Sequence, residues 1–418
     1  YQSNQRNYKR LKNSHSNINK SRTRLMFSYG LGDAGTGLAA TQLGFYLFPF
    51  LIGYAGLPAL IAGSILMLIK VWDAINDPLI GWLSDKTNTK WGPRIPWMLI
   101  GAIPLGFTLA AIWWVPDGTL LQRTTYYVFI SILLMTAYTS VNLPFAALST
   151  ELSEEISIRT RLNASRFTGS IIAGLSGLII AANILSKNEI GYFTMGKISG
   201  FVAALATLIS CWGLAPFAKK ARKPSKSQIP LKFQLKRIFQ NNKFIKVISL
   251  YLLLWCALQL MQTVSIIYVE QVLYIPSKFS KWIPIPFQLS ALLGLQVWSF
   301  FSNKFDRIFA LKIGSIIWIF SCLCTLFIPS FEIGGQLDEL FFFQGNNLYS
   351  FIILILIICM IGMGASTAYL IPWSLLPDAI DDDPEKSAGL YTAWMVFIQK
   401  IGIGLSVQFL GVLLSLSG

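Results

Sequence analysis

The chain has 418 residues, of which 54% are hydrophobic and only 13% are charged. This balance excludes a soluble enzyme and is typical of a protein that crosses a membrane many times. The net charge of +15 would suit nucleic acid, but the basic residues lie between apolar segments, so we expect no nucleic-acid partner. All five cysteines lie inside apolar segments and the one histidine, His15, lies in a polar tail, so neither a cofactor nor an enzyme active site is expected.

Apolar segments long enough to cross a bilayer follow a basic tail at 1–24. We count eleven spans: 25–52, 57–83, 96–116, 122–150, 161–185, 195–217, 243–275, 282–303, 308–329, 347–377 and 387–417. A basic linker at 218–242 divides them into a bundle at 25–217 and a bundle at 243–418. This division predicts an all-α polytopic membrane protein with a two-fold repeat of six-helix bundles, and a twelfth span beyond Gly418.

The basic residues also predict the orientation of the chain. With the N-terminus in the cytoplasm, the cytoplasmic segments carry 26 Lys and Arg residues and the outer loops carry 5. Positively charged loops stay on the cytoplasmic side. We therefore expect a multi-pass protein of the cell (inner) membrane with a cytoplasmic N-terminus and with membrane lipids around it.

The second span carries Asp73, Asn76 and Asp77 near its middle. These spacings place the three side chains on one face of a helix. A carboxylate at this depth costs about 2.5–3.5 kcal/mol on insertion scales, so we expect something to offset the two charges. Thr139 and Asn142 on the fourth span can add oxygen ligands, and hard cations such as Na⁺ prefer oxygen ligands.

Two alternatives to a sodium site remain open. Protons are the first, because clustered carboxylates hold protons more tightly. The second is a permanent ion pair between helices, with Lys400 of the last span as the base and Lys70 as another candidate partner of Asp73. Two acids and one base leave an excess negative charge, which favours an exchangeable cation.

Two long motifs resemble a known family. They are VWDAINDPLIG at 71–81 and DKTNTKWGPRIPW at 85–97, with shorter matches SYGLGD at 28–33, PFAAL at 144–148 and QKIG at 399–402. They are similar to the glycoside–pentoside–hexuronide:cation symporters of the major facilitator superfamily. The resemblance covers nearly the whole chain and implies the major facilitator fold.

The resemblance also implies roles for individual residues. It implies a cation (Na⁺) site of Asp73, Asn76, Asp77 and Thr139, and a solute site that includes Tyr138, Arg166 and Lys400. Relatives place sugar-binding acids where this chain has Gly37 and Asn142. Animal relatives with the same pattern move lysophospholipids, so the cargo is not defined by the resemblance. From the residues themselves we add three more candidates for the solute site: Asn142, Asp33 and Trp394. Asp33 lies one helical turn before Gly37, and the ring of Trp394 could stack on a sugar.

A further group of residues predicts a gate at the cytoplasmic ends of the helices. The segment Gly81 to Lys86 matches the G-x-x-x-D-[RK] signature of the superfamily, in which an acid can pair with a base across the bundle. An acid run from Asp378 to Asp383 follows the tenth span, and Arg94 or Arg159 could pair with it. The candidate gate residues are Gly81, Asp85, Lys86, Arg94 and Asp378.

These observations together predict a secondary active transporter. We expect symport of a small solute, such as a sugar or glycoside, with Na⁺ or H⁺ by alternating access. Two alternatives are a carrier of lysolipid-like amphiphiles and a non-transporting membrane receptor of the same fold.

Overall fold

The computed structural model describes residues 23–152, 156–187, 191–219, 239–328, 346–381 and 388–416. Residues 1–22 of the basic tail and 220–238 of the linker lie outside the described residues. The helices of the first half are α2 (Ala34–Pro49), η1 (Phe50–Tyr54), α3 (Ala59–Lys86), α4 (Ile95–Ala111), α5 (Leu120–Leu152), α6 (Ile156–Leu185) and α7 (Tyr192–Ala218). Those of the second half are α9 (Asn242–Ile267), η3 (Tyr268–Val272), α10 (Ser277–Ser280), α11 (Pro284–Lys304), α12 (Arg307–Thr325), α14 (Asn346–Ala365), α15 (Thr367–Asp381) and α16 (Ala388–Leu416).

The all-helical architecture is confirmed for the described residues, and so are ten of the eleven predicted spans. Ten of the described helices are long and apolar enough to cross a membrane, and α4, at the predicted span 96–116, is a shorter apolar helix. The span at 347–377 differs in detail, because it is interrupted at Ser366 between α14 and α15. Glycines at 362 and 364 precede this break, and Pro372 follows it without an amide hydrogen to donate.

Helix α3 positions the two acids of the predicted cation site. Pro58 precedes its first turn, and Thr87 leaves the helix in an extended conformation. Inside the helix, Pro78 follows Asp77 directly. Proline cannot donate the backbone hydrogen bond to the carbonyl four residues earlier. The carbonyl of Ala74, next to Asp73, therefore accepts no backbone hydrogen bond from residue 78.

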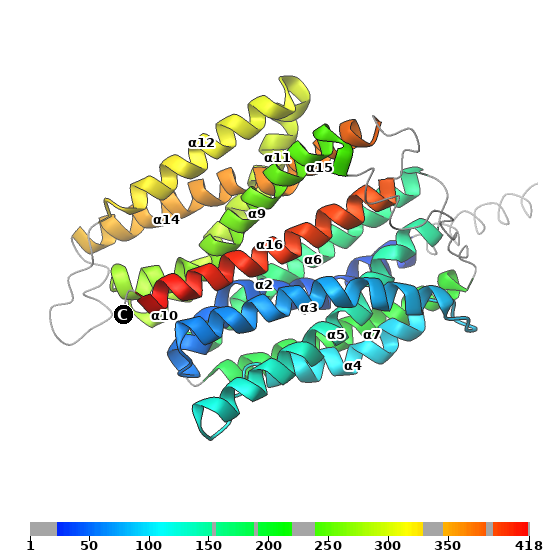
Figure 1. Cartoon of the computed structure of the whole chain (residues 1–418), viewed down its shortest axis with the longest axis horizontal. Helices are drawn as coiled ribbons and strands as arrows, with labels where there is room; N and C mark the ends of the chain where they lie inside the picture. Colours follow the sequence, from blue (N-terminus) through cyan, green and yellow to red (C-terminus); the bar gives the residue numbers. More distant parts are fainter. Residues whose placement is uncertain are drawn as a thin grey trace, which may run out of the picture.

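The two halves of the chain form two bundles that meet along a few helices (Figure 1). Helix α16 packs against α3 of the first bundle and α9 of its own, so it lies between them (Figure 1). Helix α2 also contacts α9, and α6 contacts α11. The last described helix thus brings side chains of the second bundle to the acidic face of α3.

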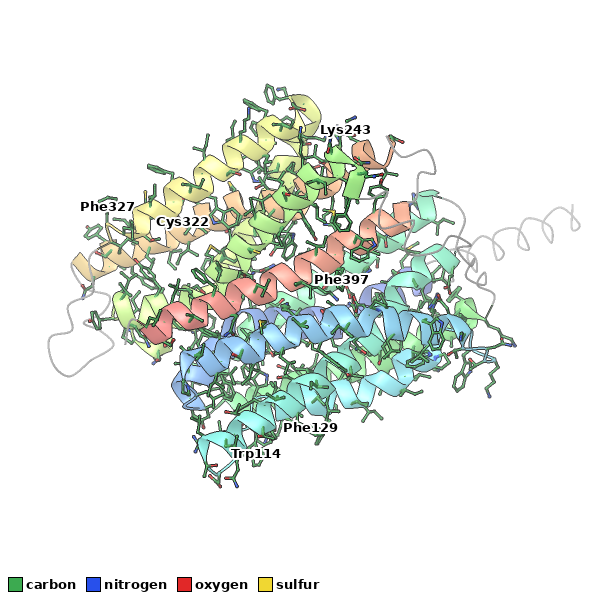
Figure 2. The ribbon with its side chains drawn as sticks, viewed as in Figure 1. Trp114, Phe129, Lys243, Cys322, Phe327 and Phe397 are labelled. Atoms are coloured by element: carbon green, nitrogen blue, oxygen red, sulfur yellow. The ribbon has the colours of Figure 1, made fainter. Side chains whose placement is uncertain are left out.

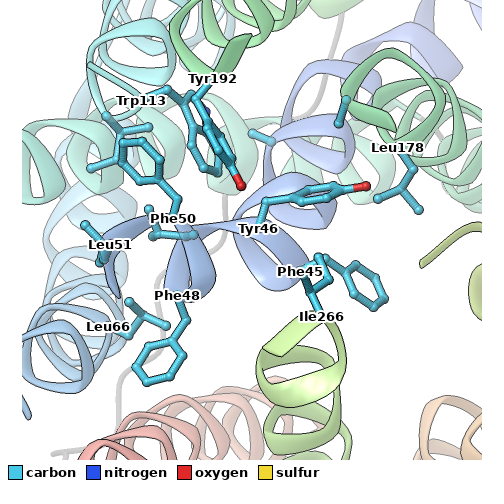
Figure 3. Close-up of a cluster of buried hydrophobic side chains, with 14 of the residues drawn as sticks. Phe45, Tyr46, Phe48, Phe50, Leu51, Leu66, Trp113, Leu178, Tyr192 and Ile266 are labelled. Carbon is cyan, nitrogen blue, oxygen red and sulfur yellow. The ribbon is translucent and has the colours of Figure 1, made fainter. Parts of the chain in front are cut away.

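Among the described residues, one apolar cluster includes side chains of both bundles, and it lies at one end of the molecule. We call the end where α7 finishes and α9 begins the linker end, and the opposite one the far end. One buried cluster at the far end includes Phe45 and Leu66 of the first bundle and Ile266 of the second (Figure 3). At the linker end, one cluster around Phe145 and another around Tyr391 stay within their own bundles.

Specific contacts close the far end. The hydroxyl of Tyr46 on α2 donates a hydrogen bond of 2.6 Å to the carbonyl of Lys281, just after α10. The rings of Phe45 and Phe287 meet edge to face with their centroids 5.7 Å apart. The structure therefore represents a state that is closed at the far end, with separate cores at the linker end.

The exterior of the molecule is apolar. Side chains such as Phe129, Phe327 and Trp114 point outward from the helices (Figure 2), and Phe327 is 85% exposed. A soluble monomer rarely exposes so much apolar surface, whereas lipid tails cover it without a penalty. This is the surface of a multi-pass membrane protein.

Close helix packing within the first bundle gives a testable consequence. A Cβ atom on Gly200 of α7 would lie 2.1 Å from the carbonyl oxygen of Gly106 on α4. We expect Gly200→Ala to cost about 1–3 kcal/mol, the usual range for overpacking, and to lower the thermal unfolding midpoint in detergent. Gly53→Ala is the matched control, since no atom lies within 4 Å of the added carbon. Equal midpoints for both variants would contradict this packing.

Candidate cation and solute site

The acidic face of α3 is held against α5. Asp73 is only 8% exposed and Asn76 only 2%. The Thr139 hydroxyl of α5 donates a 3.1 Å hydrogen bond to Oδ1 of Asp73. The Asn76 amide nitrogen lies 3.5 Å from the carbonyl oxygen of Met135, which turns the Asn76 side chain toward α5. The structure thus brings together the four residues of the predicted cation site.

Lys400 joins this face from the other bundle. Its Nζ atom lies 2.8 Å from Oδ2 of Asp73 and 2.5 Å from Oδ2 of Asp77. The three side chains keep between 11% and 25% of their surface exposed, so water reaches them. An ammonium group between two carboxylates leaves a local charge of −1.

Lys70, the other candidate partner of Asp73, is placed differently. It is partly buried on α3, and its Cβ lies beside Gly404 of α16. The charges of Asp73 and Lys400 both act on it. However, Lys70 makes no hydrogen bond or ion pair among the described residues, so Asp73 pairs with Lys400 instead.

A second polar cluster surrounds Asp33, at the turn between the first helical turns of the chain and α2. Its Oδ1 atom accepts hydrogen bonds of 2.9 Å from both Asn142 and Thr36. Its Oδ2 atom accepts a 3.0 Å hydrogen bond from Nε of Arg166, so the two form an ion pair. Thr36 was not among the predicted site residues, although it lies one turn along the same helix.

Tyr138 lies on α5 next to Thr139 of one cluster and one helical turn before Asn142 of the other. The charges of Asp33, Arg166, Asp73 and Asp77 all act on its hydroxyl. Gly37 leaves no space for a side chain, because a Cβ there would lie 2.2 Å from the hydroxyl oxygen of Ser170. An acid at this position would not fit, which gives a steric reason for the departure from the sugar-binding pattern.

Trp394 is the predicted solute residue that the structure does not bring to these clusters. Its ring packs against Phe239 and Phe397 at centroid distances of 6.0 and 5.3 Å. It also borders the apolar cluster around Tyr391 in the second bundle. Its observed surroundings are therefore those of a packing residue in this state.

The predicted gate residues lie at the linker end. Arg94 is 5% exposed and pairs with Asp85 at 2.6 Å and with Glu151 at 2.7 Å. It also donates a hydrogen bond to Ser84. Asp378 pairs with Arg307 at 2.8 Å, not with Arg94. A Cβ added at Gly81 would lie 3.4 Å from the Leu143 side chain on α5, and the Lys86 ammonium lies 3.6 Å from the centre of the Trp82 ring. Each of these contacts joins two residues of the same bundle.

Glu151 was missed by the sequence analysis and makes a test of the Arg94 cluster possible. Burial raises the pKa of the Glu151 carboxyl, and the Arg94 guanidinium opposes that rise. Removing one partner of a buried pair costs about 3–5 kcal/mol. We expect Arg94→Gln to lower stability at neutral pH, because Glu151 is left without its base.

The effect of pH on this variant has a defined sign. Without Arg94 the pKa of Glu151 rises further above its unfolded value, so stability falls as the pH rises through the folded value. The defect should therefore shrink toward pH of about 4.3, the ordinary glutamate value. Unfolding midpoints across pH measure this, and Arg94→Gln with Glu151→Gln should recover most of the loss. A defect that is independent of pH in the single variant would contradict the assignment.

The described residues contain no group of three or more His, Cys, Asp or Glu side chains that could hold a metal ion. The Asp73 site differs from such a cluster, since two carboxylates, an amide and a hydroxyl suit a weakly bound monovalent cation rather than a resident metal.

Comparisons with known proteins show the family and the fold of the chain. A family model described as MFS/sugar transport protein matches residues 28–418. The uncharacterized symporter sll1374 of Synechocystis is 29% identical, over 94% of this chain and 85% of its own. The sodium-dependent lysophosphatidylcholine symporter 1 of Gallus gallus is 24% identical, over 91% of this chain and 76% of its own.

One solved structure shows the same fold. The nucleoside transporter NupG superimposes with a TM-score of 0.63 at 14% sequence identity, over 95% of this chain and 92% of its own. At that identity the likeness is one of architecture alone.

Proposed function

Because this chain belongs to the MFS/sugar transport protein family, and so is a membrane transporter rather than an enzyme, we propose that it performs cation-coupled symport. In this proposal Na⁺ is the first cation to test and H⁺ the alternative. The cation binds among Asp73, Asn76, Asp77 and Thr139. The solute binds near Asp33, Tyr138, Asn142, Arg166 and Lys400, with Trp394 as the candidate of the second bundle.

One observation carries the proposal: Lys400 of the second bundle pairs with both acids of the first. A cation that enters between Asp73 and Asp77 must displace the Lys400 ammonium group. The displaced side chain is then free to contact a solute. Cation binding and solute binding thus favour each other, and the coupling is reciprocal.

The same exchange links binding to movement of the bundles. Lys400 crosses from α16 to α3, so its ion pairs bridge residues 25–217 and 243–418, which we propose to be the two rocking units. The far end is closed by the core around Phe45. In the opposite state the linker end would close, and Gly81, Asp85, Lys86, Arg94 and Asp378 are placed at that end to form contacts. In the cell this end is cytoplasmic, in the inner membrane.

The solute is proposed to be a sugar or glycoside, on the basis of the family and of the polar groups around Tyr138. A second candidate is a lysolipid-like amphiphile. It is favoured by the likeness to a sodium-dependent lysophosphatidylcholine symporter and by the lack of room for a sugar-binding acid at Gly37.

Uptake into proteoliposomes tests the function. We expect solute accumulation that requires an inward Na⁺ or proton gradient, and no accumulation when the gradient is collapsed by an ionophore. Radiolabelled glycosides and lysolipids are the two arms. Binding of solute without any cation effect and without net flux would instead identify a receptor, and would overturn the proposal.

A further inference from the structure

The two halves of the chain repeat one backbone corner at the far end. Helix α2 ends in the π-helical turn η1, and α9 ends in the π-helical turn η3. Four residues beyond each turn stands a proline, Pro58 in the first half and Pro276 in the second. We call residues 50–58 the first corner and residues 268–276 the second corner.

The backbone follows the same path in both corners. Two amides beyond each π-helical turn donate hydrogen bonds back to carbonyls of that turn. These bonds join Ala55 to Phe50 and Leu57 to Leu51 in the first corner, and Leu273 to Tyr268 and Ile275 to Val269 in the second, at 2.8 to 3.2 Å. The residue between the two donors has a positive φ in each corner, +69° at Gly56 and +56° at Tyr274. Glycine is the usual residue at such a helix end, because a Cβ atom is unfavourable there.

Tyr274 is therefore the strained member of the pair. Among the residues that the structure describes, it alone combines a side chain with a positive φ. Its side chain is 55% exposed, so burial of the ring does little to offset the backbone strain. Strain of this kind persists only where the surrounding structure holds it, and it is concentrated at segments that switch conformation.

The first corner is held inside its own bundle. The Arg123 guanidinium of α5 donates a hydrogen bond of 3.1 Å to the carbonyl of Ala55. The ring of Phe50 meets the ring of Trp113, at the end of α4, with their centroids 5.2 Å apart. These contacts fix the first corner to helices that move with it, so its conformation does not depend on the other bundle.

The second corner is instead tied to the opposite bundle. The Lys281 ammonium pairs with Glu270 of η3 at 2.7 Å, and the Ser280 hydroxyl donates to the same carboxylate. This pairing folds the segment after the corner back onto η3 and fixes the carbonyl of Lys281. That carbonyl accepts the 2.6 Å hydrogen bond from Tyr46 of the first bundle. The strained corner and the contact between the bundles thus belong to one connected unit.

We propose that the second corner is a strained latch, which Tyr46 holds closed and whose relaxation at Tyr274 favours opening of the far end. When the bond from Tyr46 to the Lys281 carbonyl breaks, the corner moves away with its bundle and Tyr274 returns to a negative φ. The strain opposes the closing contacts and so sets how often this end opens. The inference rests on the alternation of the two bundles in the proposed function, and it adds the contact that controls one end.

Access of a thiol reagent to the far-end core measures this opening. Phe287→Cys places a thiol on α11, at a side chain that is 3% exposed and whose ring meets Phe45 of the first bundle. The background is the purified full chain with its five native cysteines replaced by alanine. A maleimide reaches this thiol only when the far end opens, so the modification rate is proportional to the open fraction. Phe45→Cys repeats the measurement from the other bundle, and neither experiment needs Na⁺ or a solute.

Variants of the two corners give opposite expected results. Tyr274→Gly removes the strain and keeps the backbone path, so the modification rate should fall by roughly fivefold or more. Tyr274→Asn should fall less, since asparagine tolerates a positive φ better than tyrosine. Tyr46→Phe removes the hydrogen bond to Lys281, so the rate should rise by about fivefold.

Gly56→Ala is the matched control, because it introduces strain into the corner that is held inside one bundle. The added Cβ would lie 3.6 Å from Arg123, an ordinary contact. This variant should lower the thermal unfolding midpoint but leave the modification rate within about twofold. An unchanged or higher rate in Tyr274→Gly would overturn the inference, as would an unchanged or lower rate in Tyr46→Phe or a larger change in Gly56→Ala. Absence of gradient-driven uptake by the unaltered chain, with the expected rates intact, would overturn the proposed function and leave the latch in place.

Discussion

A chain with Lys400→Gln is expected to be strongly destabilised in the absence of Na⁺ and to regain stability when Na⁺ is added. Lys400 is the base that pairs with both Asp73 and Asp77. Removing one partner of a buried ion pair costs about 3–5 kcal/mol, because the remaining charges have no compensation. A cation between the two acids takes over that role, and at 100 times its dissociation constant it stabilises the fold by about 2.7 kcal/mol.

The measurement is the unfolding midpoint of purified protein, with Na⁺ titrated against choline at constant ionic strength. Lys312→Gln is the control, since it removes an exposed lysine of the second bundle. A second variant, Lys400→Gln with Asp77→Asn, should be less sensitive to Na⁺ because one unpaired carboxylate is gone. If Lys400→Gln is as stable as the control without Na⁺, its two ion pairs have no energetic role.

Asp73→Asn is expected to abolish gradient-driven uptake while leaving the protein folded. Asparagine keeps the shape and the hydrogen bond from Thr139, and Asp77 remains to pair with Lys400. The cation loses one of its two carboxylates, an attraction of about 4 kcal/mol for charges 4 Å apart at an effective dielectric constant near 20. We expect cation affinity to fall by roughly two orders of magnitude or more.

Uptake under an inward Na⁺ gradient, compared with exchange of solute at equal Na⁺, measures this loss. Exchange should persist in Asp73→Asn, because the solute groups around Asp33 are unchanged. Asp306→Asn is the matched control: Asp306 is exposed and caps α12 through Ile308, a role that asparagine also fills. Gradient-driven uptake at the control's rate in Asp73→Asn would remove Asp73 from the cation site.

Much of the fold could be predicted from the sequence because hydropathy and span length are local properties. The spacing of Asp73, Asn76 and Asp77 likewise predicted one helix face. Local spacing could not decide whether Lys70 or Lys400 pairs with Asp73, because that depends on how α16 packs against α3. Lys70 is near Asp73 in sequence, yet Lys400 reaches Asp77 from 323 residues away and pairs with Asp73 as well.

Other contacts depended on three-dimensional packing in the same way. Glu151 lies 57 residues from Arg94 and in a segment that looked like an ordinary helix end. Asn142 and Asp33 were each named as solute residues, but their hydrogen bond to each other follows from the packing of α2 against α5. The interruption at Ser366 has a weak local signal in the flanking glycines and Pro372.

Sodium affinity with and without the Lys400 ammonium tests the central claim most directly, namely that Lys400 and a cation compete for Asp73 and Asp77. Equilibrium binding of radioactive sodium to the purified chain measures it without knowledge of the solute. The account predicts that Lys400→Gln binds Na⁺ at least roughly tenfold more tightly than the unaltered chain, a gain of about 1.4 kcal/mol. Equal or weaker Na⁺ binding by Lys400→Gln would contradict the account.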